Sequence, residues 1–420
     1  MPQLLSFFQP GNLGNIVGAG SDGVLGGILT PVAPDKFLLK GQAAAGLCIT
    51  DDGGLHINET TPFGNATADD VELLAAVPAN DDAVYFGHAT VKFGRVDLNI
   101  TTTGVGTWTI TYYYWDGSAY VALANVVDGT GGFTGAGTGW KTITFDVPTD
   151  WAKNTVDGVL AYWIQGVVSG YSAVTTPPQA GQGWLILETP VWTDDTTDFG
   201  DADTGDVKLL PDYPIVDDAA YIGHSEQFCA LKVTTSVART GTATLVVKYW
   251  DGTTWSALPV VADYSVGWSA TAGTHLILFQ PPADWVACLA ENGPNSQTGF
   301  FVSMELTALT SMTAQPLATR GWVSPITTGA TGLSCPASGT ITKVSMNAQT
   351  KSASNADSQF VLLNVTKGTS VGFTWTKAIA LVEETISLAV TKDDELILLQ
   401  VKEDGTTEFA NAQFWFTLAA

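Results

Sequence analysis

The sequence has little charge for its length, and basic residues are the scarcest kind. Asp, Glu, Lys and Arg make up 14% of the 420 residues, against about 25% in an average globular domain. The 17 basic residues are outnumbered by 41 acidic ones, which gives a net charge of −24. Because no basic stripe is available to displace phosphate counterions, we expect no direct binding to nucleic acid or to an anionic membrane surface. So little charge is typical of a β-rich surface of Thr, Ser and Gly, or of a surface that faces other subunits.

Cysteines and long apolar runs are also scarce. The four cysteines form no Cys-x-x-Cys pair, so neither a disulfide framework nor a usual zinc spacing is expected. They are predicted to be small apolar fillers: Cys48, Cys229, Cys288 and Cys335. No run of eighteen apolar residues occurs, so no segment is expected to span a membrane. The N-terminal stretch lacks the basic residues of a signal peptide.

The sequence is rich in the alternation that β-strands require. In TWTITYYYW, residues 107–115, every second side chain is large and apolar: Trp108, Ile110, Tyr112 and Tyr114. Asp116-Gly117 then follows, which is a strong hairpin signal because glycine adopts a positive φ without steric cost. Helix-period runs are few, so the chain is predicted to be all-β.

A module of roughly 135 residues is present twice. Residues 70–88 align without gaps with residues 206–224, and eleven of these nineteen positions are identical. Downstream, Pro-Thr-Asp-Trp151 corresponds to Pro-Ala-Asp-Trp285. In this corner, Pro presets φ, Asp is predicted to cap the following amides, and Trp is predicted to plug one end of the core.

These patterns divide the chain into four parts. Residues 1–50 are Gly-rich and weakly patterned, and they are predicted to be an extended N-terminal arm that becomes ordered against another surface. Residues 51–190 (copy 1) and 191–323 (copy 2) are predicted to be tandem antiparallel β-sandwich modules. Residues 324–420 read as six to eight short strands, and we expect a C-terminal jelly-roll-like β-sandwich there.

The repeated motifs resemble a known family. Tyr-[Phe/Ile]-Gly-His, Tyr-Trp-Asp-Gly, Pro-x-Asp-Trp and Gln-Gly-Trp together look like a β-sandwich module of tailed-bacteriophage virion proteins, over residues 59–323. The resemblance implies a capsid decoration, head-fibre or baseplate-associated protein, with a terminal domain that sometimes binds carbohydrate. Copy 1 departs from the pattern, since Tyr120 replaces the tryptophan found at Trp255 and Gln165 stands where a basic residue is expected.

Two histidines recur at equivalent positions. His88 and His224 each follow a glycine at the predicted end of a strand. A paired functional site is one interpretation, and a strand-end hydrogen bond is the favoured one, because buried polar groups are nearly always paired. No HExxH, GxSxG or Cys/His arrangement accompanies them.

One acidic segment partly matches a calcium loop. It contains six carboxylates: Asp194, Asp195, Asp198, Asp201, Asp203 and Asp206. The spacing lacks the distant bidentate Glu of such a loop. A solvated inter-module turn is therefore the favoured interpretation, and bound calcium is the alternative.

Aromatic residues flank both Asp-Gly turns. Trp115 and Trp250 precede the turns, and Tyr120 and Trp255 follow them. Such residues could stack on sugar rings or on a neighbouring subunit. We expect them instead to pack across each hairpin as a cross-strand pair, because that pair stabilises the hairpin itself.

The expected function is structural. We assign no catalytic, cofactor-binding or metal-ligating residue and expect no enzyme and no cofactor. The resemblance implies a virion location, after assembly in the host cytoplasm, and contacts with the major capsid protein or other virion proteins. We expect a symmetric homo-oligomer, a trimer, held by neutral and apolar surface. The alternatives are a tail, fibre or baseplate protein whose C-terminal domain binds host glycan, and a polysaccharide hydrolase.

Overall fold

The structure is a computed structural model in which nearly all regular elements are strands of antiparallel sheets. The all-β sandwich prediction is therefore confirmed. The chain forms two compact units: unit 1 comprises Met1–Leu39, Trp192–Asp212 and Val216–Ala420, and unit 2 comprises Lys40–Val191 and Tyr213–Ile215. The structure describes residues 3–8, 26–29, 32–135, 137–201, 207–263, 265–279, 281–325, 333–334, 338–347, 358–364, 366–367, 369–375, 381–402 and 413–419.

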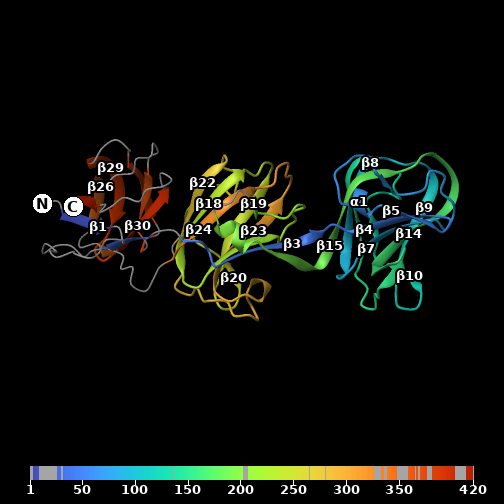
Figure 1. Cartoon of the computed structure of the whole chain (residues 1–420), viewed down its shortest axis with the longest axis horizontal. Coiled ribbons are helices and arrows are strands. Elements are labelled where there is room, and N and C mark those ends of the chain that lie inside the picture. The colour runs from blue at the N-terminus through green and yellow to red at the C-terminus, as the bar shows by residue number, and fades with distance from the viewer. Residues whose placement is uncertain are drawn as a thin grey trace. The chain divides into compact units, whose positions relative to one another are not determined.

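Unit 2 contains copy 1 as a two-sheet sandwich (Figure 1). The first sheet has the strand order β10 (Tyr120–Ala122), β9 (Val105–Trp115), β14 (Val159–Thr176), β7 (Ala83–His88), β4 (Leu47–Asp52) and β5 (Leu55–Asn58), with β13 (Asn154–Val156) paired to β14. The second has the order β11 (Val127–Asp128), β12 (Gly139–Thr144), β8 (Phe93–Thr102) and β15 (Gln179–Asp194), with β6 (Val71–Glu72) paired to β15. One short helix, α1 (Thr60–Phe63), precedes β6.

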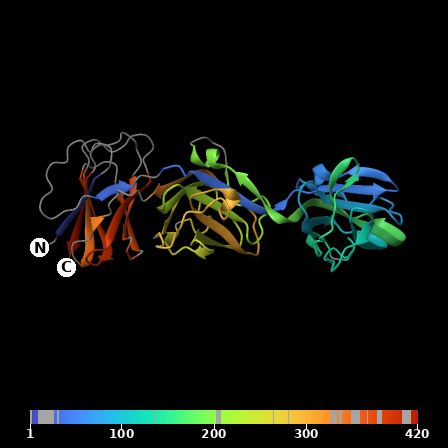
Figure 2. The ribbon, with the colours of Figure 1, turned by 90° about the horizontal axis from the view of Figure 1, so that it is seen from below.

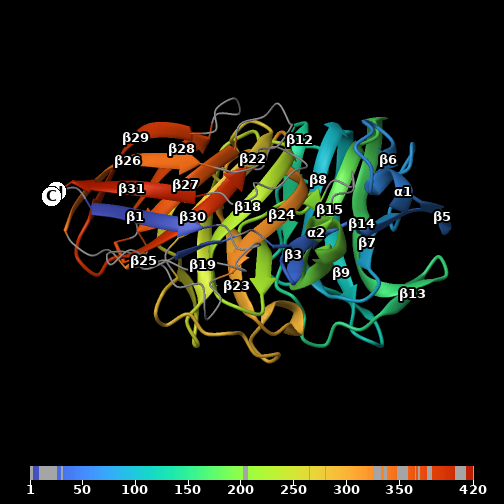
Figure 3. The ribbon, with the colours of Figure 1, turned by 60° about the vertical axis from the view of Figure 1, so that its left-hand side comes forward.

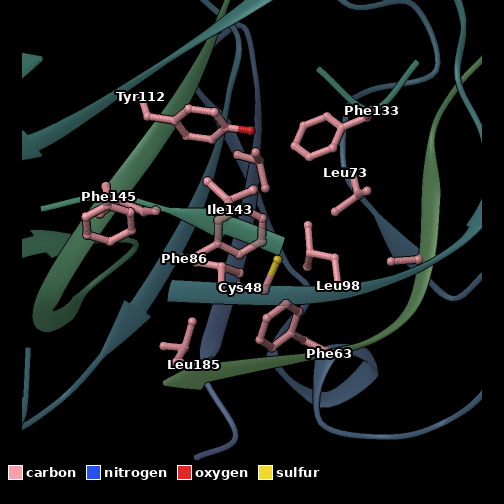
Figure 4. Packing of buried hydrophobic residues seen from close by; sticks show 14 of the residues in the cluster. Cys48, Phe63, Leu73, Phe86, Leu98, Tyr112, Phe133, Ile143, Phe145 and Leu185 are labelled. Carbon is pink, nitrogen blue, oxygen red and sulfur yellow. The ribbon is translucent and has the colours of Figure 1, made fainter. Parts of the chain in front are cut away.

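The core of unit 2 lies between these two sheets. From β9 it takes the alternate residues that the sequence predicted, and Trp108, Tyr112 and Tyr114 are buried there. Figure 4 shows Tyr112 above Phe86 and Ile143, with Phe63 of α1 at the opposite end. Burial of each such large apolar side chain stabilises the sandwich by about 1.5–3 kcal/mol.

Copy 2 has the same two-sheet plan in unit 1. Its first sheet continues from β15, whose residues 192–194 belong to unit 1, in the order β3 (Lys36–Ala44), β17 (Ala219–His224), β23 (Phe300–Leu309), β19 (Ala243–Trp250) and β20 (Trp255–Ala257). Its second has the order β16 (Val207–Lys208), β24 (Leu317–Pro325), β18 (Phe228–Val237), β22 (Gly273–Phe279) and β21 (Val260–Asp263). Two short helical segments complete it: α2 (Thr196–Gly200) and η2 (Pro294–Ser296).

The first strand of copy 2 comes from the N-terminal side of copy 1. Thr60 Oγ1 donates to the carbonyl of Cys48 on β4 (3.3 Å), and Thr196 Oγ1 donates in the same way to the carbonyl of Phe37 on β3 (3.4 Å). Phe37 therefore occupies the position of Cys48. In copy 1 a tight turn joins β4 to β5, whereas in copy 2 the whole of copy 1 lies between the corresponding strands. Copy 1 is thus inserted into copy 2, and the two are nested rather than consecutive.

The predicted arm over residues 1–50 needs correction. Phe37, Leu38 and Leu39 of β3 are all buried, because β3 faces the main core of copy 2 on one side and a smaller apolar cluster on the other. β4 is likewise an inner strand of copy 1. Residues 36–50 are therefore integral to the sandwiches. Most of the Gly-rich stretch, residues 9–25 and 30–31, lies outside the described residues.

The C-terminal residues form a further sheet that includes two N-terminal strands. Its order is β28 (Thr369–Trp375), β27 (Ser358–Asn364), β30 (Glu395–Lys402), β2 (Gly26–Leu29), β1 (Gln3–Phe8), β31 (Gln413–Ala419), β26 (Gly339–Asn347) and β29 (Leu381–Val390), with β25 (Leu333–Ser334) paired to β30. Phe373 and Leu388, from the two ends of this order, share one core, so the sheet folds over on itself. Figure 3 shows β1 beside β31, to which it pairs antiparallel, and Figure 2 shows the blue N-terminal strand among the red C-terminal ones.

Three of the predicted apolar cysteines are buried: Cys48, Cys229 and Cys288. Cys335 lies outside the described residues. In the part of the chain that the structure describes, no helix is long and apolar enough to cross a membrane.

Candidate functional site

The first aspartate of the acidic segment contacts α2 and β3. Asp194 Oδ1 accepts from the Thr196 amide (3.1 Å), and Asp194 Oδ2 lies 3.5 Å from Lys36 Nζ. Asp195 stands at the N-terminal end of α2. Asp203 and Asp206, on which the calcium interpretation depended, lie outside the described residues. Within the described ranges, no group of His, Cys, Asp or Glu side chains could hold a metal ion.

Both recurring histidines lie at strand ends and bind backbone. The Val91 amide donates to His88 Nδ1 (3.1 Å), and the Glu226 amide donates to His224 Nδ1 (3.0 Å). Burial lowers the pKa of His88, and nearby Lys153 lowers it further. His224 Nε2 also lies 3.9 Å from Asp35 Oδ2. These contacts match the favoured interpretation of strand-end hydrogen bonding.

The aromatic residues around each Asp-Gly turn pack across the hairpin, as predicted. Tyr120 is the register partner of Trp115, with ring centroids 5.2 Å apart. Trp255 is the partner of Trp250 at 5.8 Å. The sequence identity of the two hairpins is therefore explained by packing within each hairpin.

The aspartate of each turn holds the hairpin closed. Asp116 Oδ1 accepts from the amides of Ser118 and Ala119, both at 2.7 Å. Asp251 Oδ1 accepts from the amides two and three residues later in the same way. Hydrogen bonds to the charged form lower the pKa of both carboxyls. Gly117 follows with a φ of +104°, which explains why glycine is needed there.

The Pro-x-Asp-Trp corner differs in part from the prediction. Trp151 and Trp285 plug the cores, each 3% exposed. The aspartate before each tryptophan, however, accepts a hydrogen bond from a core tyrosine, which sequence reasoning missed. Tyr114 Oη donates to Asp150 Oδ1 and Tyr249 Oη to Asp284 Oδ1, both at 2.9 Å. This acceptor role replaces the predicted amide cap.

The glycines in the repeated motifs leave space that an aromatic ring occupies, and we call them ring seats. A Cβ on Gly87 would lie 2.3 Å from the Trp163 ring, and a Cβ on Gly183 would lie 2.0 Å from the Phe63 ring. In copy 2, a Cβ on Gly223 would lie 2.3 Å from the Phe301 ring, and a Cβ on Gly321 would lie 2.0 Å from the Phe199 ring of α2. Real Cβ atoms do not approach so closely, so the motifs Tyr-x-Gly-His and Gly-Trp record packing requirements.

An aromatic site in unit 2 was not predicted. Tyr213 falls within the sequence range of copy 2, yet it packs in unit 2, where its ring stacks on Trp184 with centroids 5.4 Å apart and planes 15° apart. Trp140 also packs against the Tyr213 ring, with centroids 5.0 Å apart and planes tilted by 45°. The residue aligned with Tyr213 in copy 1 is Val77, so the duplication gave no signal for this role.

A buried carboxylate lies beside this aromatic site. Asp97 is fully buried, and its Oδ1 accepts from Arg95 Nε at 2.6 Å. Burial raises the pKa of Asp97, while hydrogen bonds from Arg95 and the Tyr213 hydroxyl lower it. Movement of Tyr213 would take a hydrogen bond away from the buried Asp97 carboxylate, which is costly. The carboxylate therefore holds Tyr213 in place.

No protein-family model matches the chain, and no curated protein matches it. The residues that the two copies share are turn aspartates, ring seats, core plugs and cross-strand pairs. Their arrangement positions backbone and aromatic rings, and among the described residues it brings no sequence-predicted candidates together into a shared reactive centre.

Proposed function

We propose that this protein is a structural component of a bacteriophage virion, a capsid decoration or head-associated protein that binds the capsid surface through protein–protein contacts. The observation that carries the proposal is the role of the duplicated residues. The tyrosine–aspartate bond, the ring seats and the core plugs recur in both copies at matching distances. A module kept for its shape is what a scaffold requires. The motif resemblance to virion modules supports the same proposal.

The surface suits association without ionic pairing. Unit 2 exposes isolated apolar side chains, among them Leu55 and Val127, each 66% exposed. Charged residues are only 14% of the chain. Interfaces of such composition gain affinity from buried apolar and neutral area. The partners we propose are the major capsid protein or other virion proteins and a second and third copy of this chain, in a homotrimer without enzymatic activity.

The test is the number of copies per particle. Virions from a phage that encodes this chain are purified, and the chain is quantified against the major capsid protein by mass spectrometry with labelled standard peptides. Hundreds of copies support a capsid decoration protein. A handful, in a multiple of three or six, would favour the tail or baseplate alternative, with host glycan as ligand of the C-terminal domain. Absence from purified particles would refute a virion role.

A further inference from the structure

The outer face of the first sheet of copy 2 differs in chemistry from its counterpart in copy 1. On this face Tyr221, Ser303 and Lys248 are register partners across β17, β23 and β19. Glu305 follows Ser303 by two residues on β23 and forms an ion pair with Lys248. We call this row, together with the flanking Trp192 and Trp255, the outer-face site, and all its residues belong to unit 1.

The aromatic part of the outer-face site is a continuous set of rings. Trp255 lies edge-on to Tyr221 with centroids 5.1 Å apart, and Trp192 packs against the same ring at 5.4 Å. Trp250 on β19 packs against Trp255 on the neighbouring strand β20. Trp192 and Trp255 are only partly buried, so indole surface is accessible at both ends of the set.

The polar part lies next to these rings. The Lys248 and Glu305 side chains are 23% and 16% exposed, so the pair is held in place but remains accessible to solvent. An ammonium group has three donors and a carboxylate has several acceptor positions, so one mutual contact leaves capacity on both groups. Ser303, between Tyr221 and Lys248, is fully buried, and among the described residues its hydroxyl has no hydrogen-bond partner.

Copy 1 lacks this ion pair on the equivalent face. The row there is Tyr85, Gln165 and Tyr113, and Val167 stands in place of Glu305. The strand β13 and the start of β14 cover it, since Val156 and Val159 pack into the same apolar cluster.

Copy 2 covers the equivalent region with a different segment. It has an irregular loop with the short segment η2 in place of β13, and Cys288 is the loop residue that joins the cluster. Val286 and Leu289 of the same loop are exposed. Tyr221 and Ser303 are therefore buried, whereas Trp192, Trp255 and the ion pair at the edge of this cluster remain partly exposed.

We propose that the outer-face site of copy 2 binds a neutral hexopyranose ring of a saccharide. A pyranose presents an apolar C–H face and a rim of hydroxyls. Partly exposed indole rings supply a stacking surface for the first, and a fixed donor–acceptor pair beside them supplies hydrogen bonds for the second. Because the charges of Lys248 and Glu305 cancel, the site favours a neutral sugar over a charged one. This proposal does not rest on the virion role, since binding is measured on the purified chain.

The chain itself supplies the variants for a test. Saturation-transfer-difference NMR is recorded on the full-length protein with the methyl glycosides of glucose, galactose, mannose and N-acetylglucosamine at millimolar concentration. Lys248→Tyr with Glu305→Val installs the residues that copy 1 already carries at these positions. We expect saturation transfer to at least one glycoside with the wild type, and affinity weaker by about tenfold or more in the double variant. Trp255→Tyr, which also copies copy 1, provides a second variant should the first fail to fold.

The matched control is Tyr120→Phe in copy 1, which is expected to leave the saturation transfer unchanged. The proposal is overturned if none of the four glycosides receives saturation from the wild type. It is also overturned if a folded variant at Lys248 and Glu305, or at Trp255, binds with wild-type affinity.

Discussion

At the scale of single residues, the duplication provides pairs of side chains in similar surroundings that differ in their hydrogen bonds. Trp151 and Trp285 are equally buried and fill the same position in the two cores. Trp151 Nε1 donates to the carbonyl of Trp163 (3.2 Å), whereas Trp285 Nε1 is buried and has no partner among the described residues. The net effect of one buried hydrogen bond can therefore be measured within one chain.

We expect Trp151→Phe to destabilise its module more than Trp285→Phe, by about 1 kcal/mol. Both changes remove a similar volume, but only the first leaves a carbonyl that has lost its donor. Native-state hydrogen exchange of the amides in β8 and β18 reports the opening free energy of each copy separately. Equal losses in the two copies would contradict this account.

Glu59 is expected to make unit 2 pH-dependent. It is 6% exposed, and burial raises its pKa, with Glu72 and Asp70 adding to the rise. The folded state therefore binds the proton more tightly than the unfolded state, whose glutamates titrate near about 4.3. The stabilisation is present below that unfolded value and is lost as the pH rises through the folded pKa.

Glu59→Gln should therefore be more stable than the wild type at pH 7, with an advantage that disappears on acidification. Thermal unfolding of unit 2 followed from pH 4 to pH 7.5 gives the measurement. The exposed Glu188→Gln is the control and should show no such trend. A variant that is less stable than the wild type at pH 7 would show that the Glu59 charge is needed in the fold.

At the scale of elements, the packing of each short helix on the second sheet explains why a Phe-Gly pair and a distant Gly-Trp pair occur together in both copies. The Phe63 ring lies over the backbone of Gly183 on β15, and Phe199 of α2 lies over Gly321 on β24. In each copy the phenylalanine of the short helix requires the glycine that precedes the tryptophan. The sequence shows both motifs, but only the structure shows that they are in contact.

Gly183→Ala is expected to destabilise unit 2 by about 1–3 kcal/mol, because the added methyl overpacks a filled core. Gly64→Ala is the control, since its Cβ would meet only backbone oxygens at 3.6 and 3.7 Å, and we expect a change within about 0.5 kcal/mol. Chemical denaturation monitored by tryptophan fluorescence compares the two. Tolerance of Gly183→Ala would mean that Phe63 can shift without cost.

At the scale of the whole molecule, sequence reasoning identified the repeated module but not how its copies are connected. The alternation in β9 and the aligned motifs were sufficient for the all-β class and the duplication. β3 was not predicted because a buried inner strand such as KFLLKGQAA shows no alternation. In addition, its counterpart β4 follows it by only eleven positions, so the repeat of roughly 135 residues does not relate the two strands. The roles of Tyr213 and Asp97 could not be predicted either, because copy 1 has Val77 and copy 2 has Lys232 at the aligned positions.

The nested connection predicts that copy 1 can be excised. Residues 40–190 are replaced by the copy 1 turn Asp-Asp-Gly-Gly, which joins β4 to β5 with positive φ at Gly53 and Gly54. Tyr213→Val is added because its stacking partner in unit 2 is removed. The shortened chain should unfold cooperatively, as shown by far- and near-ultraviolet circular dichroism.

A direct splice of Leu39 to Val191 is the control for the excision. It lacks the turn and is expected to fail to fold or to aggregate, since the two strands cannot reverse direction without a loop. Loss of cooperative unfolding in the turn-bearing variant would indicate that copy 2 depends on copy 1 for its stability.

The pairing of β1 with β31 sets the order in which the sheets of the molecule unfold under mechanical tension. Pulling on the outer ends of these two neighbouring antiparallel strands loads their own hydrogen bonds first, one after another as in a zipper. Tension reaches copy 2 only after this outer sheet has ruptured, and copy 1 only after copy 2 has opened at β3 and β15. Copy 1 is thus protected from the applied force by copy 2 and the outer sheet, which enclose it in the chain.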